Sequence, residues 1–390
     1  MGQFDIKLNF DVTSGSGSLF ESVEFIKKNK FKKILIVLDQ NLSKKKYIKK
    51  YFDILKKNKK IIFNIYNYYY SSEPSYELLE KKISVFKKKK FQIIIGIGGG
   101  STIDFAKGIA LLINNNKNPL SYRGFPENLN TPVPLIAIPS TAGTGTEIVF
   151  NAVFISKKDN LKLGINYNKN YPLKSYLDPL IIHGSKKEII LGPALGAIIR
   201  SLDSLTSPHS SFVSKYFSIL SYKLIMSALK KYDNSYLFNK ETILDLQWGA
   251  LFSMMALSNS SSGPSGSVSY FLSVNHNVPQ GLGYSLAGVE FIKTNYFKNK
   301  KIYSDIIFDL YRKKNSEFEK DIKIINKYSL FCLKKLKKSK SFDLDKFKNN
   351  LINFFKNNPK AVLNLNKNNP VKLSLRELKQ IFLNIENKLS

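Results

Sequence analysis

Short apolar runs alternate with amphipathic stretches through the first half of the chain. The runs are bounded by charged or turn residues, and they are Lys33 to Leu38, Ile61 to Ile65, Phe91 to Ile97 and Pro134 to Ile138. The stretches between them that repeat apolar residues at helical spacing are Lys45 to Lys57 and Tyr76 to Lys89. Strands that alternate with helices are typical of a parallel sheet with crossover helices, so we predict a Rossmann-like α/β domain.

Helical patterns dominate after about residue 183. They are Pro193 to Ser207, Phe212 to Tyr232, Lys240 to Asn259, Lys301 to Arg312, Glu317 to Lys337 and Asp343 to Phe355. Ser374 and Glu377 form an S-x-x-E capping box for a last helix, Leu375 to Lys388. We therefore predict an α/β domain over residues 1–183 and an all-helical domain over residues 184–390, with the site in a cleft between them.

The composition is that of a globular protein. Hydrophobic residues make up 43% of the 390 residues and aromatic residues 13%, which is enough for packed cores. No apolar run reaches the roughly 18 to 20 residues of a membrane helix, and Met1 to Phe10 lacks the layout of a secretion signal. The single cysteine, Cys332, excludes a disulfide framework and a cysteine-built zinc site. We expect a soluble cytoplasmic protein with no membrane partner.

The net charge of +32 is typical of a nucleic-acid binder, but the kind of basic residue is not. Nucleic-acid readers rely on arginine because its planar fork pairs bidentately with phosphates and bases. Only four of the 61 basic residues are arginines: Arg123, Arg200, Arg312 and Arg376. Lysine is abundant together with Asn, Ile, Phe and Tyr, all of which have A/T-rich codons. We therefore favour codon bias over a polyanion partner and expect no binding of nucleic acid.

A glycine-rich segment, Gly96 to Asp104, follows the third apolar run and opens a predicted helix, Thr102 to Ile113. Glycines at such a turn let the backbone approach a pyrophosphate, and the helix N-terminus supplies N–H donors. The alternative is a tight strand-to-helix turn with no ligand.

A second segment, Pro139 to Glu147, again follows an apolar run and combines glycines with small hydroxyl residues. Hydroxyls and exposed amides suit phosphate oxygens and the amide of a nicotinamide. Asp39 ends the first run, where a carboxylate can accept from ribose hydroxyls and disfavour a 2′-phosphate. The alternative for Asp39 is a helix N-cap or turn residue.

The order of these motifs resembles that of the iron-containing (type III) alcohol dehydrogenase family, within the dehydroquinate synthase-like and glycerol dehydrogenase-like group. The motifs are Leu38-Asp39-Gln40, GIGGGSTIDFAK, PLIAIPSTAGTGTE, Lys162-Leu163-Gly164 and Leu177-Asp178-Pro179. The resemblance implies an NAD(P)-dependent interconversion of an alcohol and an aldehyde or ketone, a divalent metal and a homodimer. It implies cofactor contacts at Gly98, Gly99, Ser101, Asp104, Thr141, Thr144 and Lys162, and Asp39 favours NAD over NADP.

Two further segments, SYRGFPE and VSYFLS, resemble those of the branch with reductases of small anionic aldehydes and oxidases of sugar-acid alcohols. The resemblance therefore implies a small-molecule substrate, which is anionic if this branch is the right one.

The positions of the family's metal ligands do not carry ligands in this chain. In the family, an Asp and a His four residues apart on one helix face hold the metal together with two later histidines. The corresponding positions are Gly196, Arg200, Gly266 and Gln280. A glycine has no ligating side chain and an arginine is a permanent cation. We therefore expect no divalent metal.

Three residues near these positions are candidates for the remaining chemistry. Arg200 can stabilise an oxyanion in a dry cleft, or it can form an ion pair with Asp203 on one helix face. Tyr270 and His276 can relay a proton, or they can be a buried tyrosine and a loop histidine. Two functions remain open: a metal-free oxidoreductase, or a catalytically retired family member that retains nucleotide binding.

The run Ser258 to Ser267 is rich in Ser, Gly and Pro and interrupts a predicted helix. It is either an anion-binding nest or a relaxed loop.

Overall fold

The computed structural model describes residues 8–69, 73–156, 158, 161–311, 316–338, 350–357 and 359–389. The chain divides into two units, one of residues 9–184 with 239–247, here called the α/β unit, and one of residues 185–238 with 248–390, here called the helical unit. The predicted boundary after residue 183 lies next to this division. The assignment of the first part to the nucleotide and the second to the substrate stays a prediction.

A six-stranded parallel sheet forms the centre of the α/β unit, in the order β1-β8-β5-β4-β2-β3. Its strands are β1 (Val12–Ser14), β2 (Lys33–Asp39), β3 (Ile62–Tyr68), β4 (Ile93–Gly98), β5 (Leu135–Pro139) and β8 (Lys174–Leu177). The four predicted runs are β2 to β5, which confirms the α/β class. The strands β1 and β8 escaped prediction because three or four residues are too few to show a period.

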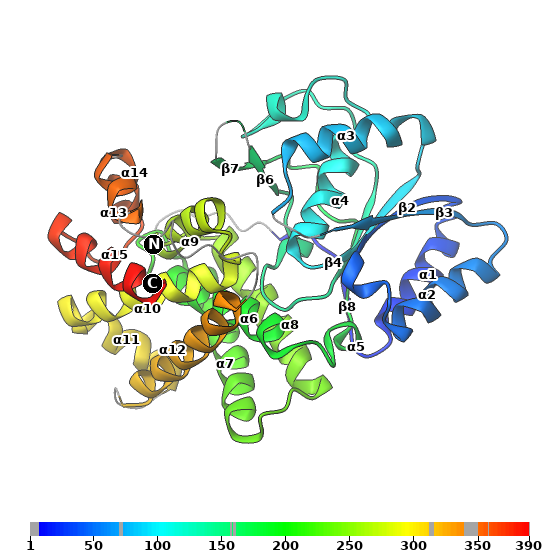
Figure 1. Cartoon of the computed structure of the whole chain (residues 1–390). Helices are drawn as coiled ribbons and strands as arrows, with labels where there is room; N and C mark the ends of the chain where they lie inside the picture. Colours follow the sequence, from blue (N-terminus) through cyan, green and yellow to red (C-terminus); the bar gives the residue numbers. More distant parts are fainter. Residues whose placement is uncertain are drawn as a thin grey trace. The chain divides into compact units, whose positions relative to one another are not determined.

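Helices cover both faces of this sheet (Figure 1). The helices α1 (Ser18–Lys28), α2 (Lys46–Lys57) and α5 (Pro179–Ile182) pack on one face. The helices α3 (Tyr76–Phe86) and α4 (Gly100–Leu112) pack on the other. Apolar side chains of β2 to β5 point alternately into the two resulting cores, which explains why these strands read as continuous apolar runs.

Asp178, in the Leu-Asp-Pro motif, joins three of these helices. Its Oδ1 caps α5 by accepting from the Leu180 N–H at 3.0 Å. Its Oδ2 accepts from the Leu19 N–H at 3.1 Å and from the Tyr47 hydroxyl at 2.6 Å, which ties α1 and α2 to the same carboxylate. A fully buried carboxylate needs such donors, so the motif is structural here.

Short elements complete the α/β unit. The strands β6 (Ala152–Ser156) and β7 (Leu161–Ile165) form a separate antiparallel pair, and β6 packs on α4. The 3₁₀ turns are η1 (Gln40–Leu42), η2 (Lys87–Lys89), η3 (Pro119–Tyr122) and η4 (Thr146–Ile148). The turn η4 begins at Thr146, at the end of the hydroxyl-rich segment.

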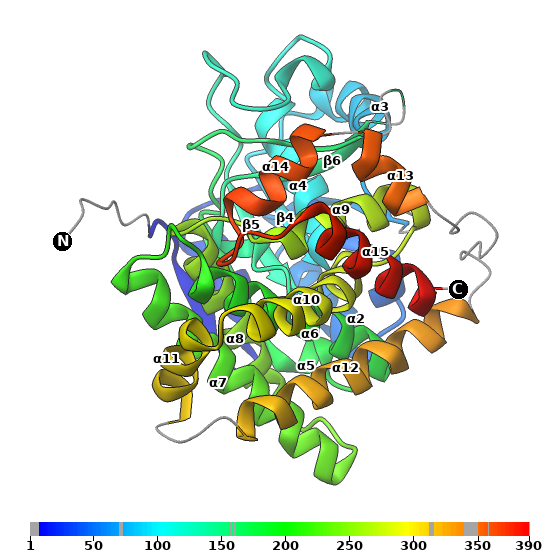
Figure 2. The same ribbon diagram turned by 90° about the vertical axis from the view of Figure 1, so that its left-hand side faces the viewer.

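The helical unit confirms the all-α prediction for the second half. Its helices are α6 (Lys187–Thr206), α7 (Phe212–Ser235), α8 (Lys240–Ser258), α9 (Pro264–His276), α10 (Gln280–Lys298), α11 (Lys300–Tyr311), α12 (Ser316–Lys337), α13 (Asn350–Asn357), α14 (Pro359–Lys367) and α15 (Leu375–Leu389). The first residues of α8, 240–247, group with the α/β unit. Within the helical unit, α10 lies against α6, α9, α12 and α15 (Figure 2).

Helix boundaries differ from the predictions where proline and serine are involved. The helix α6 begins at Lys187, six residues before the predicted start at Pro193, because the proline lies inside the helix and not at its first position. The helix α9 begins with Pro264, so the predicted interruption after Ser258 is only a short loop between α8 and α9. Of the predicted helix at 343–355, residues 343–349 lie outside the described residues, as does Arg312.

Among the described residues, only α6 is long and apolar enough to cross a membrane, and 83% of its apolar window is buried inside the protein. The core helix of a soluble protein meets the same test. Because α6 packs on α7, α10 and α12, its apolar surface is already covered by the helical unit.

Candidate functional site

The two glycine-rich segments lie side by side at the carboxyl ends of neighbouring strands. The strand β4 pairs with β5 so that Gly98 lies opposite Pro139, and the Ser140 N–H donates to the Gly98 carbonyl at 2.8 Å. In open α/β sheets, ligands bind outside the carboxyl ends of the strands. This arrangement brings together the N-terminus of α4 and residues 141–145, which we call the hydroxyl-rich turn. We call residues 98–101 with 141–145, Glu73 and Lys162 the nucleotide edge.

Close contacts explain the glycines of the nucleotide edge. A Cβ on Gly98 would lie 2.6 Å from Thr102 Cβ, and one on Gly100 would lie 2.6 Å from Thr144 Cγ2. A Cβ on Gly99 would lie 3.5 Å from Thr141 Cγ2, which is an ordinary contact. Thr141 and Thr144 therefore lie directly against the glycine turn.

Ser101 and Lys162 meet through a carboxylate that the sequence did not single out. Ser101 Oγ donates to Glu73 Oε2 at 3.0 Å, and Glu73 Oε1 lies 3.1 Å from Lys162 Nζ. The Lys162 ammonium is almost fully buried, so the ion pair compensates a charge that burial would otherwise penalise. No local pattern marks Glu73, because its two partners are far from it in the sequence.

Asp104 is held by protein groups on both oxygens. Its Oδ1 accepts from the Thr146 hydroxyl and its Oδ2 from the Val153 N–H at 3.4 Å. Burial raises the pKa of Asp104, and nearby Lys107, the hydroxyl of Thr146 and Lys162 oppose this rise. These bonds give Asp104 a structural task, and its predicted contact with the cofactor stays a prediction.

Asp39 forms the turn that was its alternative interpretation. Its Oδ1 accepts from the Asn41 N–H at 2.9 Å and from Asn41 Nδ2 at 3.1 Å, which caps η1. Burial raises the pKa of the carboxyl, although the Asn41 donors and Lys45 lower it. Both bonds end on Oδ1, so the cap does not use Oδ2. Asp39 can therefore cap the turn and still accept from a ribose hydroxyl.

Arg200 lies on α6 and is only 6% exposed. Its Nε and Nη2 donate to Ser253 Oγ on α8 at 3.0 and 2.6 Å. The ion pair with Asp203, the alternative interpretation of Arg200, stays a prediction. Asp203 accepts from Ser265 Oγ at 3.1 Å.

Asp203 is a buried carboxyl group with a raised pKa and few hydrogen-bond donors around it. Its Oδ2 accepts no hydrogen bond from any described residue, and a Cβ on Gly263 would lie 2.5 Å from that oxygen. Burial raises the pKa of Asp203 to about 7, and the Ser265 bonds oppose this rise. The carboxyl group therefore changes charge near neutral pH.

Tyr284, which the sequence analysis did not identify, completes this cluster. Its hydroxyl bonds to Ser262, and burial raises its pKa to about 12, with Tyr270 adding to the rise and Arg200 opposing it. We call Arg200, Asp203, Ser253, Ser262 and Tyr284 the hydroxyl cluster. Tyr270 lies within electrostatic reach of Tyr284, which places it near the cluster.

His276 ends α9 and is buried against the Phe271 ring, with ring centroids 5.7 Å apart. Burial lowers its pKa to about 4, so the imidazole is neutral at pH 7. A proton relay through His276 at neutral pH would therefore have to start from the neutral ring.

At the positions that the resemblance assigns to metal ligands, neighbouring residues pack closely. A Cβ on Gly196 would lie 2.6 Å from Gly281 Cα, because α6 and α10 cross there backbone to backbone. A Cβ on Gly266 would lie 2.4 Å from Ser262 Oγ and 2.6 Å from the Tyr284 hydroxyl. With Arg200 and Gln280 at the other two positions, the set offers no carboxylate and no imidazole. The described residues hold no group of three His, Cys, Asp or Glu that could bind a metal.

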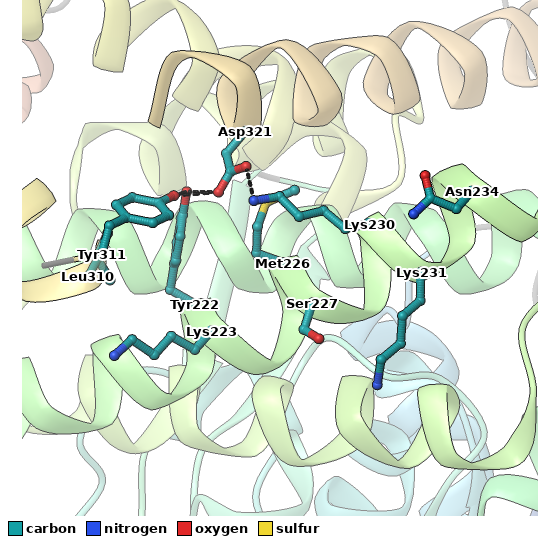
Figure 3. Close-up of a pocket in the computed structure, with 10 residues that line it drawn as sticks. All are labelled: Tyr222, Lys223, Met226, Ser227, Lys230, Lys231, Asn234, Leu310, Tyr311 and Asp321. Carbon is teal, nitrogen blue, oxygen red and sulfur yellow. Dashed lines mark hydrogen bonds and ion pairs between the residues drawn. The ribbon is translucent and has the colours of Figure 1, made fainter. Parts of the chain in front are cut away.

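A cavity of about 350 Å³ in the helical unit was not predicted (Figure 3). Asp321 of α12 is fully buried there, accepts from the Tyr222 hydroxyl at 3.0 Å and from the Tyr311 hydroxyl, and pairs with Lys230 at 2.6 Å. Figure 3 shows these groups converging on the carboxylate. These contacts join α7, α11 and α12 around the carboxylate.

Known proteins resemble this chain in sequence and in fold. Residues 10–179 match the family described as iron-containing alcohol dehydrogenase. The chain is 29% identical over 228 residues to 4-hydroxybutyrate dehydrogenase from Clostridium kluyveri, which covers 58% of this chain and 61% of that protein. It is 26% identical over 269 residues to alcohol dehydrogenase 4 from Schizosaccharomyces pombe, covering 69% of this chain and 63% of that protein. The alignments thus span somewhat less than two thirds of either relative.

Solved structures match over nearly the whole chain. A 1,3-propanediol oxidoreductase aligns with a TM-score of 0.81 at 21% identity, covering 98% of this chain and 100% of the other. A sulfoacetaldehyde reductase from Bifidobacterium kashiwanohense, solved in complex with NAD⁺, aligns with a TM-score of 0.80 at 16% identity, covering 98% of both chains. At these identities the structural likeness concerns the fold.

Proposed function

Because the chain belongs to the iron-containing alcohol dehydrogenase family, we propose that it binds a nicotinamide dinucleotide and interconverts a small alcohol with its aldehyde or ketone. The observation that carries this proposal is the nucleotide edge. Two glycine turns, the N-terminus of α4 and the Ser101 and Lys162 side chains gather at the carboxyl ends of β4 and β5.

Each part of the edge has a role in this proposal. Gly98, Gly99 and the N–H groups at the start of α4 hold the pyrophosphate, and Thr141, Thr144 and Lys162 bind the nicotinamide half. Asp39 Oδ2 accepts from a ribose hydroxyl, which favours NAD over NADP. When bound, the nicotinamide supplies or accepts the hydride.

We also propose that the protein works without the family's divalent metal. Gly196 and Gly266 offer no ligating atom. A side chain at position 196 would meet the backbone of Gly281, and one at position 266 would meet the side chains of Ser262 and Tyr284. A metal polarises the carbonyl oxygen in such a reaction, and its loss requires another stabiliser of the negative oxygen. In this proposal Arg200 takes that role and Tyr270 supplies the proton to the oxygen.

The position of Arg200 sets a condition on this role. Ser253 Oγ accepts from Nε and from Nη2, so an oxyanion would have to share the guanidinium with this serine. Loss of one oxyanion donor typically lowers kcat by about 100- to 1,000-fold. We therefore expect Arg200→Lys, which keeps a charge but not the guanidinium geometry, to lower aldehyde reduction by about that factor.

A second function, nucleotide binding without catalysis, is favoured by the same packing. If the protein can no longer transfer a hydride without the metal, the nucleotide edge can still bind a nucleotide for regulation or scaffolding. Turnover separates the two functions: a panel of small aldehydes and alcohols, some of them anionic, is assayed by NAD(P)H absorbance. Turnover that depends on Arg200 supports the oxidoreductase. Nucleotide binding without turnover on any substrate supports the retired member.

Further proposals concern partners and location. We propose a homodimer in the cytoplasm, supported by the family resemblance, with a small-molecule substrate that is anionic if the branch resemblance holds. We propose no nucleic-acid partner, supported by the scarcity of arginine, and no membrane partner, supported by the burial of α6. Size-exclusion chromatography with light scattering tests the dimer, and a doubled mass is the expected result.

A further inference from the structure

Lys107 is a fully buried lysine on α4, three residues beyond Asp104. Its Nζ donates to the Thr146 carbonyl, to Thr146 Oγ1 at 2.7 Å and to the Asn151 carbonyl at 3.0 Å. An ammonium group has three donors, and these bonds use all of them. A sequence signal for Lys107 exists, because it is the only charged residue between Phe105 and Ile113.

The acceptors of Lys107 belong to one segment, from η4 to the start of β6. Asp104 reaches the same segment, since Thr146 Oγ1 donates to its Oδ1. Lys107 Nζ lies 3.8 Å from that oxygen. The Thr146 hydroxyl therefore accepts from Lys107 and donates to Asp104, which links both charged side chains of α4 to η4.

Thr146 continues directly from the hydroxyl-rich turn of the nucleotide edge. Gly145 before it is left-handed, with φ 66°, and forms the N-cap of η4. Thr144 lies against Gly100 at the start of α4, as its 2.6 Å approach to a Cβ there shows. Fixing Thr146 to α4 thus also fixes Thr144 at the N-terminus of the same helix.

The lysine carries an energetic cost that an apolar residue would not. Burial lowers the pKa of Lys107 to about 8, while Asp104 and Glu147 oppose this fall. Those two carboxylates face it from α4 and η4, and Lys162 of β7 acts on Asp104 in turn. A methionine could fill a similar volume without burying a charge. The cost points to a role beyond packing.

We infer that Lys107 is a positioning residue of the nucleotide edge: it locks η4 to α4 and thereby holds the hydroxyl-rich turn where the dinucleotide binds. This inference rests on the proposed nucleotide binding and assigns a task to a side chain that does not touch the nucleotide.

Titration of Lys107 should change nucleotide affinity and folding stability in opposite directions as pH rises. Loss of the Lys107 proton removes a donor and a positive charge, so nucleotide affinity falls above pH 8. Stability behaves differently, because the pKa in the folded state lies below that of an unfolded lysine, near 10.5. Between these two values the unfolded state binds more protons, so the contribution of Lys107 to stability rises with pH. A purely structural lysine would not weaken binding as pH rises.

The test measures the Kd for NADH by calorimetry at pH 7 and pH 9 in the whole chain. At pH 9 only about a tenth of the molecules keep the proton. If the uncharged form binds about tenfold more weakly, we expect the wild type to bind about fivefold more weakly at pH 9 than at pH 7. We expect Lys107→Met to bind about tenfold more weakly already at pH 7, with little further change at pH 9. The control Lys57→Met removes an exposed lysine from α2 and should behave as the wild type.

Each outcome decides between the two claims. Equal Kd values for wild type and Lys107→Met at pH 7, or a wild-type Kd that does not change up to pH 9, overturn the positioning role. If the methionine variant loses its circular dichroism spectrum, the wild-type pH series decides alone. A wild type that binds no NADH at pH 7 overturns the proposed function itself, which is a different result.

Discussion

The nucleotide edge and the crossing of α6 and α10 in the helical unit use glycine in opposite ways. At the edge, a side chain added to Gly98 or Gly100 would meet the threonine side chains of Thr102 and Thr144. In the helical unit, a side chain added to Gly196 would meet the backbone of Gly281. The first kind of glycine leaves backbone N–H groups open to a ligand. The second kind lets two helices touch, and it closes the space that a ligand would need.

The two regions also differ in how they treat charge. At the edge, each buried charge has an opposite partner nearby: Glu73 for Lys162 and Asp104 for Lys107. In the hydroxyl cluster, Arg200 bonds to a serine hydroxyl and Asp203 keeps a pKa of about 7. Paired charges hold a fixed geometry, whereas a carboxyl group near its pKa makes the second region sensitive to pH.

The largest expected effect comes from restoring a ligand at position 196. Gly196→Asp places Cβ 2.6 Å from Gly281 Cα, and backbone atoms give way less than side chains. We expect a loss of about 3 kcal/mol or more of stability in urea unfolding, and no bound iron or zinc in elemental analysis.

The matched control for that variant is Gly192→Ala on the same helix. No atom lies within 4 Å of the added Cβ. We expect stability to rise by about 0.5 to 1 kcal/mol, since alanine favours the helix. A stable Gly196→Asp protein with one metal per chain would show that the crossing of α6 and α10 opens readily.

The second effect concerns Asp203 and pH. Its folded pKa of about 7 exceeds the ordinary value of 3.8, so the folded state holds a proton that the unfolded state has lost between these values. Stability therefore falls as pH rises from about 4 to about 7, by about 2 to 4 kcal/mol for a shift of this size. We expect Asp203→Asn to remove this fall.

Fluorescence of Trp248, the single tryptophan, reports on the helical unit. Urea midpoints at pH 4.5 and pH 7.5 for wild type and Asp203→Asn give the comparison. The same pH dependence in both proteins would mean that Asp203 is ionised and stabilised in the folded state, and the contrast between the two regions would then be smaller.

The smallest effect on stability is expected at the nucleotide edge, because threonine side chains can move. In Gly100→Val, the Cβ of the new valine would lie 2.6 Å from Thr144 Cγ2. The two side chains would overlap, so Thr144 would have to move. We expect NADH affinity to fall about a hundredfold, with stability nearly unchanged. Equal affinity for Gly100→Val and the wild type would contradict the proposed place of the hydroxyl-rich turn.

The sequence predicted the elements and motifs whose signals lie close together along the chain. It did not predict residues whose partners come from distant segments. The strands β2 to β5 and the turn at Gly98 to Ser101 are visible because their signals lie within ten residues. Glu73 and Tyr284 are not, because their roles arise from partners brought close only by the fold: Ser101 and Lys162 for the first, Ser262 for the second. The alternative roles of Asp39 also needed coordinates, which show that the turn uses only one carboxylate oxygen.

The central proposal is that this chain has the nucleotide site of iron-containing alcohol dehydrogenases without their metal site. Native mass spectrometry of the purified protein, incubated with NAD⁺ without chelator, tests both halves on the same molecules. We expect each chain to gain the mass of one dinucleotide and no mass of iron or zinc. A retained metal ion on each chain, or no dinucleotide at all, would contradict the account.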